Sequence, residues 1–450
     1  MGVDTLVAQA TAPVPAGVAV VRLSGPLAHA IARQISGKNE LPHASMRFAT
    51  LRDGQSDVID RGYIVAFFAP ASFTGEDIAE FHVHGSIAVS QKLVEVCCGL
   101  GARPALAGEF SLRAFEHGKL DLVQAEALLD LISARSDDAR KSALSQLDGN
   151  LSRLLLQLRQ PLLHVLAEIE ARLDFATEAD VGLLDRATLL TQLQAAQQEI
   201  ESLTATMRAG RLRLQGARVV LYGAPNAGKS TLLNALAGAD RALVDARPGT
   251  TRDTIEVTTA PQGVQITWID TAGMRLAGDH VEQLGTERTR REVEHADVVL
   301  WLDDGAAVTD IEPPQLINPD AIVLAVHSKI DVKMGQPQFD LLFVPSMALS
   351  VADNSGVPEL LDAVVLAVRS LGQQGGRGDG VAIARQRHAA ALADAGAAIA
   401  RARAALRDDM PLEFAAADLR DALLALAELV GDVRADDVLG VIFGQFCIGK

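Results

Sequence analysis

The segment 223–230, with the sequence GAPNAGKS, constrains this chain more than any other feature. It fits the phosphate-loop pattern GxxxxGK[ST], follows the apolar run 218–222 and precedes the helical pattern 231–236. Glycines allow backbone N–H groups to surround phosphate oxygens, and the helix that follows presents its positive end to them. The segment therefore predicts a nucleoside-phosphate site in an α/β domain, and by itself it leaves adenine and guanine undecided.

Two further motifs belong to this predicted site. Within the loop, Lys229 is expected to neutralise the β- and γ-phosphates and Ser230 to ligate Mg²⁺. DTAG at 270–273 ends an apolar run, so its carboxylate can reach Mg²⁺ through water and its glycine can sense a γ-phosphate. Between these motifs lies GTTRD at 249–253, whose threonine hydroxyls are expected to complete the Mg²⁺ shell.

The base is predicted from SKID at 328–331, which follows the apolar run 321–326. A guanine site normally has Asn-Lys-x-Asp here, so Lys329 and Asp331 match and Ser328 does not. A carboxylate at Asp331 accepts both N–H donors of guanine and repels the acceptors of adenine, which favours GTP over ATP. Serine is too short to span both the base and the phosphate loop, so we expect weaker nucleotide affinity.

Periodicity divides the chain into four segments. Residues 1–119 alternate short apolar runs with Gly, Pro and Ser, which predicts an α+β domain, whereas 120–214 has Leu and Ala at helical spacing. Residues 215–372 alternate strand and helix patterns, which predicts a doubly wound α/β domain. A glycine-rich joint at 371–380 precedes the second helical segment, 373–450. The simplest architecture places both helical segments in one bundle, with the α/β domain inserted between them.

Composition excludes several classes of protein. Of 450 residues, 49% are apolar and 22% charged, which excludes wholesale disorder. No apolar stretch reaches the roughly 18 residues of a membrane span, and Asp4 stands where a signal peptide would be basic, so a cytoplasmic protein without membrane contact is expected. Three cysteines, Cys97, Cys98 and Cys447, cannot form a disulfide framework. The net charge of −16 disfavours a generic nucleic-acid coat protein, so any nucleic-acid partner needs a local basic patch or another protein.

The motifs together resemble one known family. The C-terminal FCIGK, at 446–450, resembles the ending of the tRNA-modifying GTPase family MnmE, also called TrmE. DLR at 418–420 is similar to that family's late helices. The segments that resemble its N-terminal domain are 5–11 (TLVAQAT), 20–25 (VVRLSG), 73–77 (FTGED), 82–85 (HVHG), 108–110 (GEF), 113–115 (RAF) and 118–121 (GKLD). The resemblance spans the whole chain.

The resemblance implies a homodimer held by N-terminal folate-binding domains, with a GTPase domain inserted into a helical domain. It implies a flavoprotein partner, MnmG, in a heterotetramer that acts on the wobble uridine of tRNA and adds an aminomethyl-type or carboxymethylaminomethyl group at carbon 5. The one-carbon unit would come from 5-formyl- or methylene-tetrahydrofolate. The implied folate contacts are Arg22, Glu80, Lys119 and Lys450, since a pterin offers an amidine-like edge to a carboxylate and its glutamate tail suits basic groups. Cys447 is either a thiol near the folate or a small buried residue.

The resemblance also implies roles in hydrolysis. A K⁺ ion held by Asn226, Thr250 and the backbone carbonyl oxygens of Asp245 and Arg247 replaces an arginine finger, and Ser230 and Thr251 ligate Mg²⁺. The implied catalytic residues are Glu282, which orients the attacking water, Lys229 and Thr251. A loop near residue 350 closes over the base. The complete expected nucleotide-binding set is Asn226, Ala227, Gly228, Lys229, Ser230, Thr231, Asp245, Ala246, Arg247, Pro248, Gly249, Thr250, Thr251, Asp270, Thr271, Ala272, Gly273, Ser328, Lys329, Asp331, Ser350 and Val351.

Three functions compete at this point: a tRNA-modification GTPase, a regulatory or ribosome-assembly GTPase, and a folate-dependent one-carbon transferase with an acquired nucleotide domain. A ribosome-assembly factor should carry a basic RNA-binding module, whereas residues 1–119 hold ten Lys and Arg against eleven Asp and Glu. A transferase alone would not need a GTPase switch. The FCIGK ending and the N-terminal motifs favour the first function.

Overall fold

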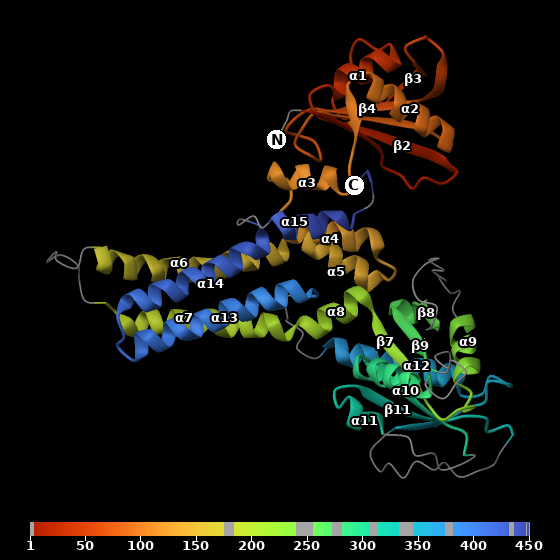
Figure 1. Cartoon of the computed structure of the whole chain (residues 1–450), viewed down its shortest axis with the longest axis vertical. Helices are drawn as coiled ribbons and strands as arrows, with labels where there is room; N and C mark the ends of the chain where they lie inside the picture. The colour runs from red at the N-terminus through yellow and green to blue at the C-terminus, as the bar shows by residue number, and fades with distance from the viewer. Residues whose placement is uncertain are drawn as a thin grey trace. The chain divides into compact units, whose positions relative to one another are not determined.

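The chain forms two compact units in a computed structural model, one made of residues 1–129 with 423–450 and the other of 130–422 (Figure 1). The second unit contains helices and a complete α/β domain. The structure describes residues 4–174, 184–239, 255–271, 281–305, 313–332, 345–373, 381–431, 436–446 and 448–449.

A six-stranded sheet in the order β3-β4-β5-β2-β1-β6 organises the first unit. All neighbours are antiparallel except β1 and β6, which are parallel. The register places Arg22 of β2 opposite Glu80 of β5. The strands are β1 (Thr5–Gln9), β2 (Ala16–Ser24), β3 (Arg47–Arg52), β4 (Val58–Phe67), β5 (Ile78–Gly85) and β6 (Ala102–Pro104).

Strand alternation gives this sheet two different faces. Helices α1 (Ala28–Ser36) and α2 (Ile87–Gly99) bury one face with residues such as Phe81. Cys97 lies in this core, where burial raises the pKa of its thiol to about 12, so it is an inert core residue as predicted. On the other face, Phe110 of α3 (Glu109–Glu116) packs with residues of β1.

Three helical segments from distant parts of the sequence meet in the same unit. Phe115 of α3 packs with residues of α4 (Leu122–Ser133) and α15 (Asp436–Gly444). Gly431 lies directly against the Phe115 ring, where a Cβ would be 2.6 Å from a ring carbon. The late helical segment therefore completes the hydrophobic core beside the N-terminal domain.

Long amphipathic helices form one part of the second unit. Helix α7 packs against α6 and runs beside α13 (Figure 1). Arg401 of α13 forms an ion pair with Asp418 of α14. Two of these helices begin at side chains that cap them, Ser136 and Asp185. The helices are α5 (Asp137–Leu147), α6 (Asn150–Asp174), α7 (Arg186–Ala205), α8 (Met207–Gln215), α13 (Gln386–Arg407) and α14 (Leu412–Val430).

A second six-stranded sheet, in the order β12-β11-β10-β7-β9-β8, forms the α/β domain of this unit. Only the edge strand β8 runs antiparallel to its neighbour. The near-continuous apolar strands have helices on both faces, since two separate hydrophobic clusters line the sheet. Its elements are β7 (Ala217–Gly223), α9 (Lys229–Ala239), β8 (Ile255–Thr259), η1 (Pro261–Gly263), β9 (Ile266–Asp270), α10 (Val281–Glu294), β10 (Val298–Asp303), α11 (Pro314–Ile317), β11 (Ile322–His327), β12 (Ser346–Ala348) and α12 (Val357–Gln373).

The chain passes from the helical part into the α/β domain and back again at neighbouring places. After the α/β domain, the extended segment 381–385 lies against α8, where a Cβ on Gly210 would be 2.0 Å from the Ile383 carbonyl oxygen. The Ile383 N–H donates to Thr206 Oγ1 at 3.1 Å. The entry and the exit of the α/β domain are therefore held together.

The predicted fold class, a multidomain α+β and α/β chain with a helical part, is confirmed. The boundaries 1–119, 120–214, 215–372 and 373–450 stay predictions. The predicted joint at 371–380 begins later than expected, because Leu371 is buried and α12 continues to Gln373; the remainder of the joint lies outside the described residues.

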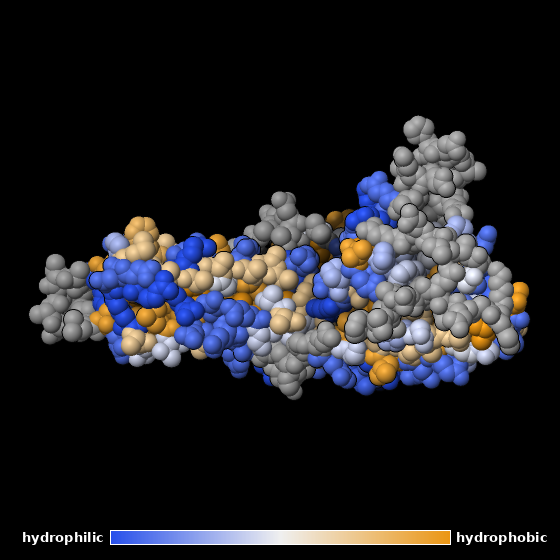
Figure 2. Space-filling model, turned by 90° about the horizontal axis from the view of Figure 1, so that it is seen from below, coloured by the Kyte–Doolittle hydropathy of each residue, from blue (hydrophilic) through white to orange (hydrophobic). Residues whose placement is uncertain are grey.

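On the face drawn in Figure 2, hydrophilic and hydrophobic residues are interspersed. Among the helices that the structure describes, none is long and apolar enough to cross a membrane.

Candidate functional site

The phosphate loop connects the end of β7 to the start of α9. Gly223 has φ 145°, and a Cβ there would be 2.2 Å from the Leu302 carbonyl oxygen, so only glycine fits. Asn226 adopts a left-handed φ of 64° and Gly228 one of 89°. These conformations produce the tight turn before α9, and the turn aims the first N–H groups of that helix at the loop.

Lys229 and Ser230 lie where this turn becomes a helix. The Lys229 ammonium is buried and donates to the carbonyl oxygens of Gly223 at 2.8 Å and Ala224 at 2.7 Å. Ser230 Oγ donates to Asp270 Oδ2 at 2.5 Å, which joins the phosphate loop to the end of β9. A hydroxyl and a carboxylate are hard oxygen donors that suit Mg²⁺, so these two residues fit that ion.

Ser328 occupies the position where the guanine motif has asparagine. Its hydroxyl donates to the Ala227 carbonyl oxygen at 2.7 Å, and it also contacts the Asp303 carbonyl oxygen at 3.2 Å. The expectation that serine cannot span both the base and the phosphate loop stays a prediction, but its hydroxyl does reach the loop. The reason is that the loop backbone at Ala227 is fully buried beside the end of β11.

The remaining base-site residues lie on two neighbouring loops. The Ile330 N–H donates to the Leu349 carbonyl oxygen at 3.4 Å, so the SKID segment is adjacent to the loop near residue 350. Asp331 is exposed and Val351 half-buried. Ser350 Oγ is buried and has no hydrogen-bond partner among the described residues.

Several predicted nucleotide residues do not join this cluster or cannot be placed. Thr231 is exposed on α9. The Thr271 hydroxyl donates to the Leu221 carbonyl oxygen at 2.7 Å, which gives its side chain a structural role. The side chain of Glu282, on α10, lies outside the described residues. So do Asp245, Ala246, Arg247, Pro248, Gly249, Thr250, Thr251, Ala272 and Gly273.

A second predicted site lies on the first unit. Arg22 Nε donates to Glu80 Oε1 at 2.8 Å across strands β2 and β5. The Arg22 guanidinium also lies over the rings of Phe73, at 5.6 Å, and Phe110, at 5.8 Å. Among the described residues, the terminal amino groups of Arg22 have no other hydrogen-bond partner, so they can bind an anionic group.

Glu80 is held in its ionised form. Burial alone would raise the pKa of this carboxyl, but a hydrogen bond with His82 at 3.2 Å and the charge of Arg22 bring the pKa below its ordinary value of 4.5. Glu80 therefore remains a carboxylate at neutral pH and can accept a pair of N–H donors. His82 thus has a local partner in Glu80.

Other predicted residues of this site lie nearby in the fold. Lys119 Nζ donates to the Pro70 carbonyl oxygen at 3.0 Å, in the loop that carries Phe73. Ile448 bridges Ala107, and a Cβ on Gly449 would be 2.2 Å from the Gln9 carbonyl oxygen. The C-terminal segment therefore lies along β1, which neighbours the strand of Arg22. Cys447 and Lys450 lie outside the described residues.

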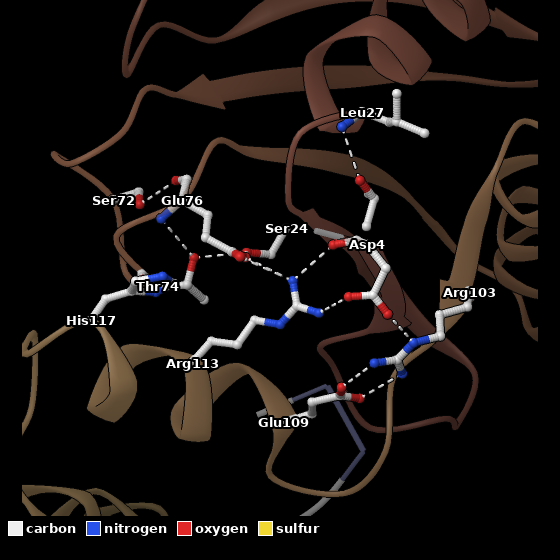
Figure 3. A network of polar contacts seen from close by, with 11 residues as sticks. Asp4, Ser24, Leu27, Ser72, Thr74, Glu76, Arg103, Glu109, Arg113 and His117 are labelled. Atoms are coloured by element: carbon white, nitrogen blue, oxygen red, sulfur yellow. Dashed lines mark hydrogen bonds and ion pairs between the residues drawn. The ribbon is translucent and has the colours of Figure 1, made fainter. Parts of the chain in front are cut away.

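A buried polar network fixes the loop and helix beside Arg22 (Figure 3). Arg113 of α3 donates to Asp4 Oδ1 at 2.6 Å and to the Glu76 carboxylate at 3.0 and 3.1 Å. Ser24 Oγ contacts both Glu76 Oε2 and Thr74 Oγ1 at 2.7 Å. The network thereby joins β1, β2, α3 and the loop before β5.

Sequence reasoning missed the roles of three of these residues. Phe73 and Phe110 lie in segments that carry the family resemblance, yet nothing in their spacing shows that both rings approach Arg22. Arg113 belongs to RAF at 113–115, and an arginine within a largely apolar helix is the one signal that could have indicated a buried charge network.

Comparison with known proteins decides the family. A family model described as the MnmE helical domain matches residues 122–447, and one described as the GTP-binding protein TrmE N-terminus matches residues 5–119. The chain belongs to the MnmE (TrmE) family. The MnmE family resemblance proposed from the motifs is therefore confirmed.

Curated MnmE relatives match along the full chain. Proteins named tRNA modification GTPase MnmE from Synechococcus sp. (strain RCC307) and Phenylobacterium zucineum (strain HLK1) are 41% and 42% identical to it. The alignments cover 99% of this chain in both cases, and 98% and 100% of the relatives. The G domain of the T. maritima FeoB iron transporter is 22% identical over 34% of this chain and 98% of that chain, with a TM-score of 0.25, too low to support an argument.

Membership of the MnmE family confirms the predicted enzyme class, a GTP hydrolase of the tRNA-modification type, and with it guanine-nucleotide binding. The cluster of Lys229, Ser230, Asp270, Ser328 and Lys329 is the part of the predicted site that the structure brings together. Among the described residues, no group of three or more His, Cys, Asp or Glu side chains is arranged to hold a metal.

Proposed function

We propose that this protein is a K⁺-stimulated GTPase that modifies carbon 5 of the wobble uridine in tRNA. It acts as a cytoplasmic homodimer with the flavoprotein MnmG and uses a tetrahydrofolate one-carbon unit to add an aminomethyl or carboxymethylaminomethyl group. The observation that supports this most is that one chain of the MnmE family combines a phosphate loop with a separate cluster of charged and aromatic side chains around Arg22 and Glu80.

The nucleotide part of the proposal rests on contacts at the phosphate loop. Lys229 neutralises phosphate charge, and the N-terminus of α9 donates N–H groups to the phosphates. Ser230, Asp270 and Thr251 would hold a Mg²⁺ ion, which would supply positive charge at the phosphates. The unsatisfied Ser350 hydroxyl beside the SKID loop gives the base site a polar group that a guanine or the Asp331 carboxylate can use.

Hydrolysis itself needs a positioned water and neutralised charge between the phosphates. In this proposal Glu282 orients the water, and a K⁺ ion at Asn226, Asp245, Arg247 and Thr250 supplies the positive charge. We expect faster GTP hydrolysis in K⁺ than in Na⁺, because a cage of neutral oxygens selects the larger ion. Steady-state phosphate release at matched ionic strength measures this, and equal rates in the two salts would contradict it.

The folate part rests on the Arg22–Glu80 ion pair of the first unit and the aromatic rings beside it. The ionised Glu80 carboxylate can accept the paired N–H donors of a pterin, and the Arg22 amino groups can bind an acidic tail. The nearby rings of Phe73 and Phe110 offer an aromatic surface to a flat ligand. Lys119 and Lys450 add positive charge for the glutamate. When bound, the folate would supply the one-carbon unit.

Arg22→Ala and Lys119→Ala should each weaken binding of 5-formyl-tetrahydrofolate about 30-fold, the effect of losing one charged contact of about 2 kcal/mol. GTP affinity should not change, because the two sites belong to different units. Isothermal titration of both ligands measures this. Arg47→Ala, which replaces an exposed arginine of β3, is the matched control. Unchanged folate affinity in both variants would remove these residues from the site.

Nucleoside analysis of tRNA tests the whole function. A strain that lacks the gene should lose the C5 modification of wobble uridines, and the unsubstituted gene should restore it. A complementing copy with Lys229→Ala should fail if hydrolysis drives the modification. If the amount of C5-modified wobble uridine does not change on deletion, a regulatory or ribosome-assembly GTPase would be favoured instead.

A further inference from the structure

Asp304 lies next to the nucleotide site, and none of the motifs above includes it. It follows β10 directly, and its side chain is only 14% exposed. Its carboxylate Oδ2 is 3.0 Å from the Lys329 ammonium. Lys329 is the lysine of the SKID segment, which makes Asp304 its charged partner.

The same ammonium reaches the phosphate loop. Lys329 Nζ donates to the Asn226 carbonyl oxygen, and its side chain lies across the loop, since a Cβ on Gly228 would be 3.9 Å from Lys329 Cε. Both Lys329 and Asn226 have left-handed backbone conformations, with φ 61° and 64°. Such conformations are strained for residues other than glycine and persist where surrounding contacts enforce them. The Lys329 bridge is one such contact.

Asp304 is itself held in place by its neighbour. Asp303 Oδ1 accepts the Gly305 N–H at 3.0 Å, which closes a turn around Asp304. The Asp303 carbonyl oxygen also accepts the Ser328 N–H at 2.8 Å. The turn after β10, the SKID segment and the phosphate loop are therefore joined by backbone and side-chain bonds.

An isolated ion pair at a protein surface contributes little. The Asp304–Lys329 pair differs, because its carboxylate is mostly buried and its ammonium also donates to a carbonyl oxygen of the phosphate loop. These contacts hold both groups in one geometry. Hydrogen bonds between charged groups are about twice as strong as neutral ones. The Coulomb attraction of Asp304 keeps the lysine stem over the loop.

We propose that Asp304 is a positioning residue for the nucleotide: it acts through Lys329 to hold the phosphate loop at Asn226 and to slow nucleotide release. This inference rests on the GTP site assigned above. It concerns how long the nucleotide stays bound, whereas selection of guanine is assigned to Asp331.

Asp304→Asn in the full-length protein should raise the dissociation rate of a fluorescent GDP about tenfold, measured by stopped flow after displacement with unlabelled GDP. Single-turnover hydrolysis of bound GTP should stay within twofold, because the reacting groups are untouched. Asp304→Glu keeps the charge, so its GDP dissociation rate should lie between those of the unsubstituted protein and Asp304→Asn. Asp362→Asn, which neutralises an exposed carboxylate of α12, is the matched control.

A double-mutant cycle separates positioning from general stability. Lys329→Ala should also speed GDP release, and the double variant Asp304→Asn with Lys329→Ala should release GDP no faster than Lys329→Ala alone. Additive effects, or a GDP dissociation rate within twofold of the unsubstituted protein for Asp304→Asn, would overturn the proposal. Failure of the unsubstituted protein to bind GDP would instead reject the GTP site itself.

Discussion

Lys229→Ala is expected to lower kcat/KM for GTP by at least about 100-fold. The Lys229 ammonium is buried at the turn between β7 and α9, and it is the charge that the phosphate loop directs to the β- and γ-phosphates. Loss of one such preorganised group typically lowers rates by about two to three orders of magnitude. Phosphate-release kinetics over a range of GTP concentrations measure the change.

The control for this variant is thermal unfolding, because the ammonium also donates to the carbonyl oxygens of Gly223 and Ala224. A modest fall in melting temperature is compatible with the prediction, whereas loss of the folded state would make the kinetics uninformative. Lys229→Arg keeps the charge and should preserve the fold with little activity, since the guanidinium is larger than the turn accommodates. A kcat/KM within tenfold of the unsubstituted protein for Lys229→Ala would contradict the assignment.

Arg113→Ala should destabilise the first unit by about 1 to 3 kcal/mol, the usual effect of leaving a partly buried charged group without its hydrogen-bond partner. Arg113 is 9% exposed and supplies donors to both Asp4 and Glu76. Its loss leaves the Glu76 carboxylate, which still accepts from the fully buried Ser24 hydroxyl, without its positively charged partner (Figure 3). Calorimetric unfolding of the full-length protein, with hydrogen exchange to assign the transition, measures the effect.

Arg113→Ala should lower folate affinity as well as stability, because the network holds the loop that carries Phe73 against α3. Arg47→Ala is again the control, since an exposed arginine on the edge strand β3 should change stability by no more than about 0.5 kcal/mol. If Arg113→Ala unfolds like Arg47→Ala, the network contributes no net stability.

The fold was predictable where the sequence has strong local patterns. The phosphate loop at 223–230 occurs between a strand and a helix as expected, because its glycines and flanking apolar runs are all local signals. The late helices also follow from the helical pattern of 373–450. Such features depend on residues a few positions apart.

The less predictable features depend on residues far apart in sequence. Arg113 meets Asp4 across 109 positions and Ser328 meets Ala227 across 101, and no local pattern encodes such distances. The contact of Ser328 with the phosphate loop could not be deduced from side-chain length, because it depends on how closely the two backbones approach. Asp304 was overlooked because a carboxylate after a strand is common and only the fold brings it to Lys329.

The insertion of the α/β domain between helices that pack together has a consequence for synthesis on the ribosome. Helix α7 buries residues such as Leu193 and Ile200, and Gly396 of α13 packs against Ile200. About 200 residues separate the end of α7 from the end of α13. At a synthesis rate of about 5 to 20 residues per second, the apolar side of α7 stays without α13 for on the order of 10 to 40 s while the inserted domain is made. A nascent chain of this protein therefore passes through a stage in which a finished GTPase domain is attached to an incomplete bundle, and that stage is where a chaperone would have the most apolar surface to bind.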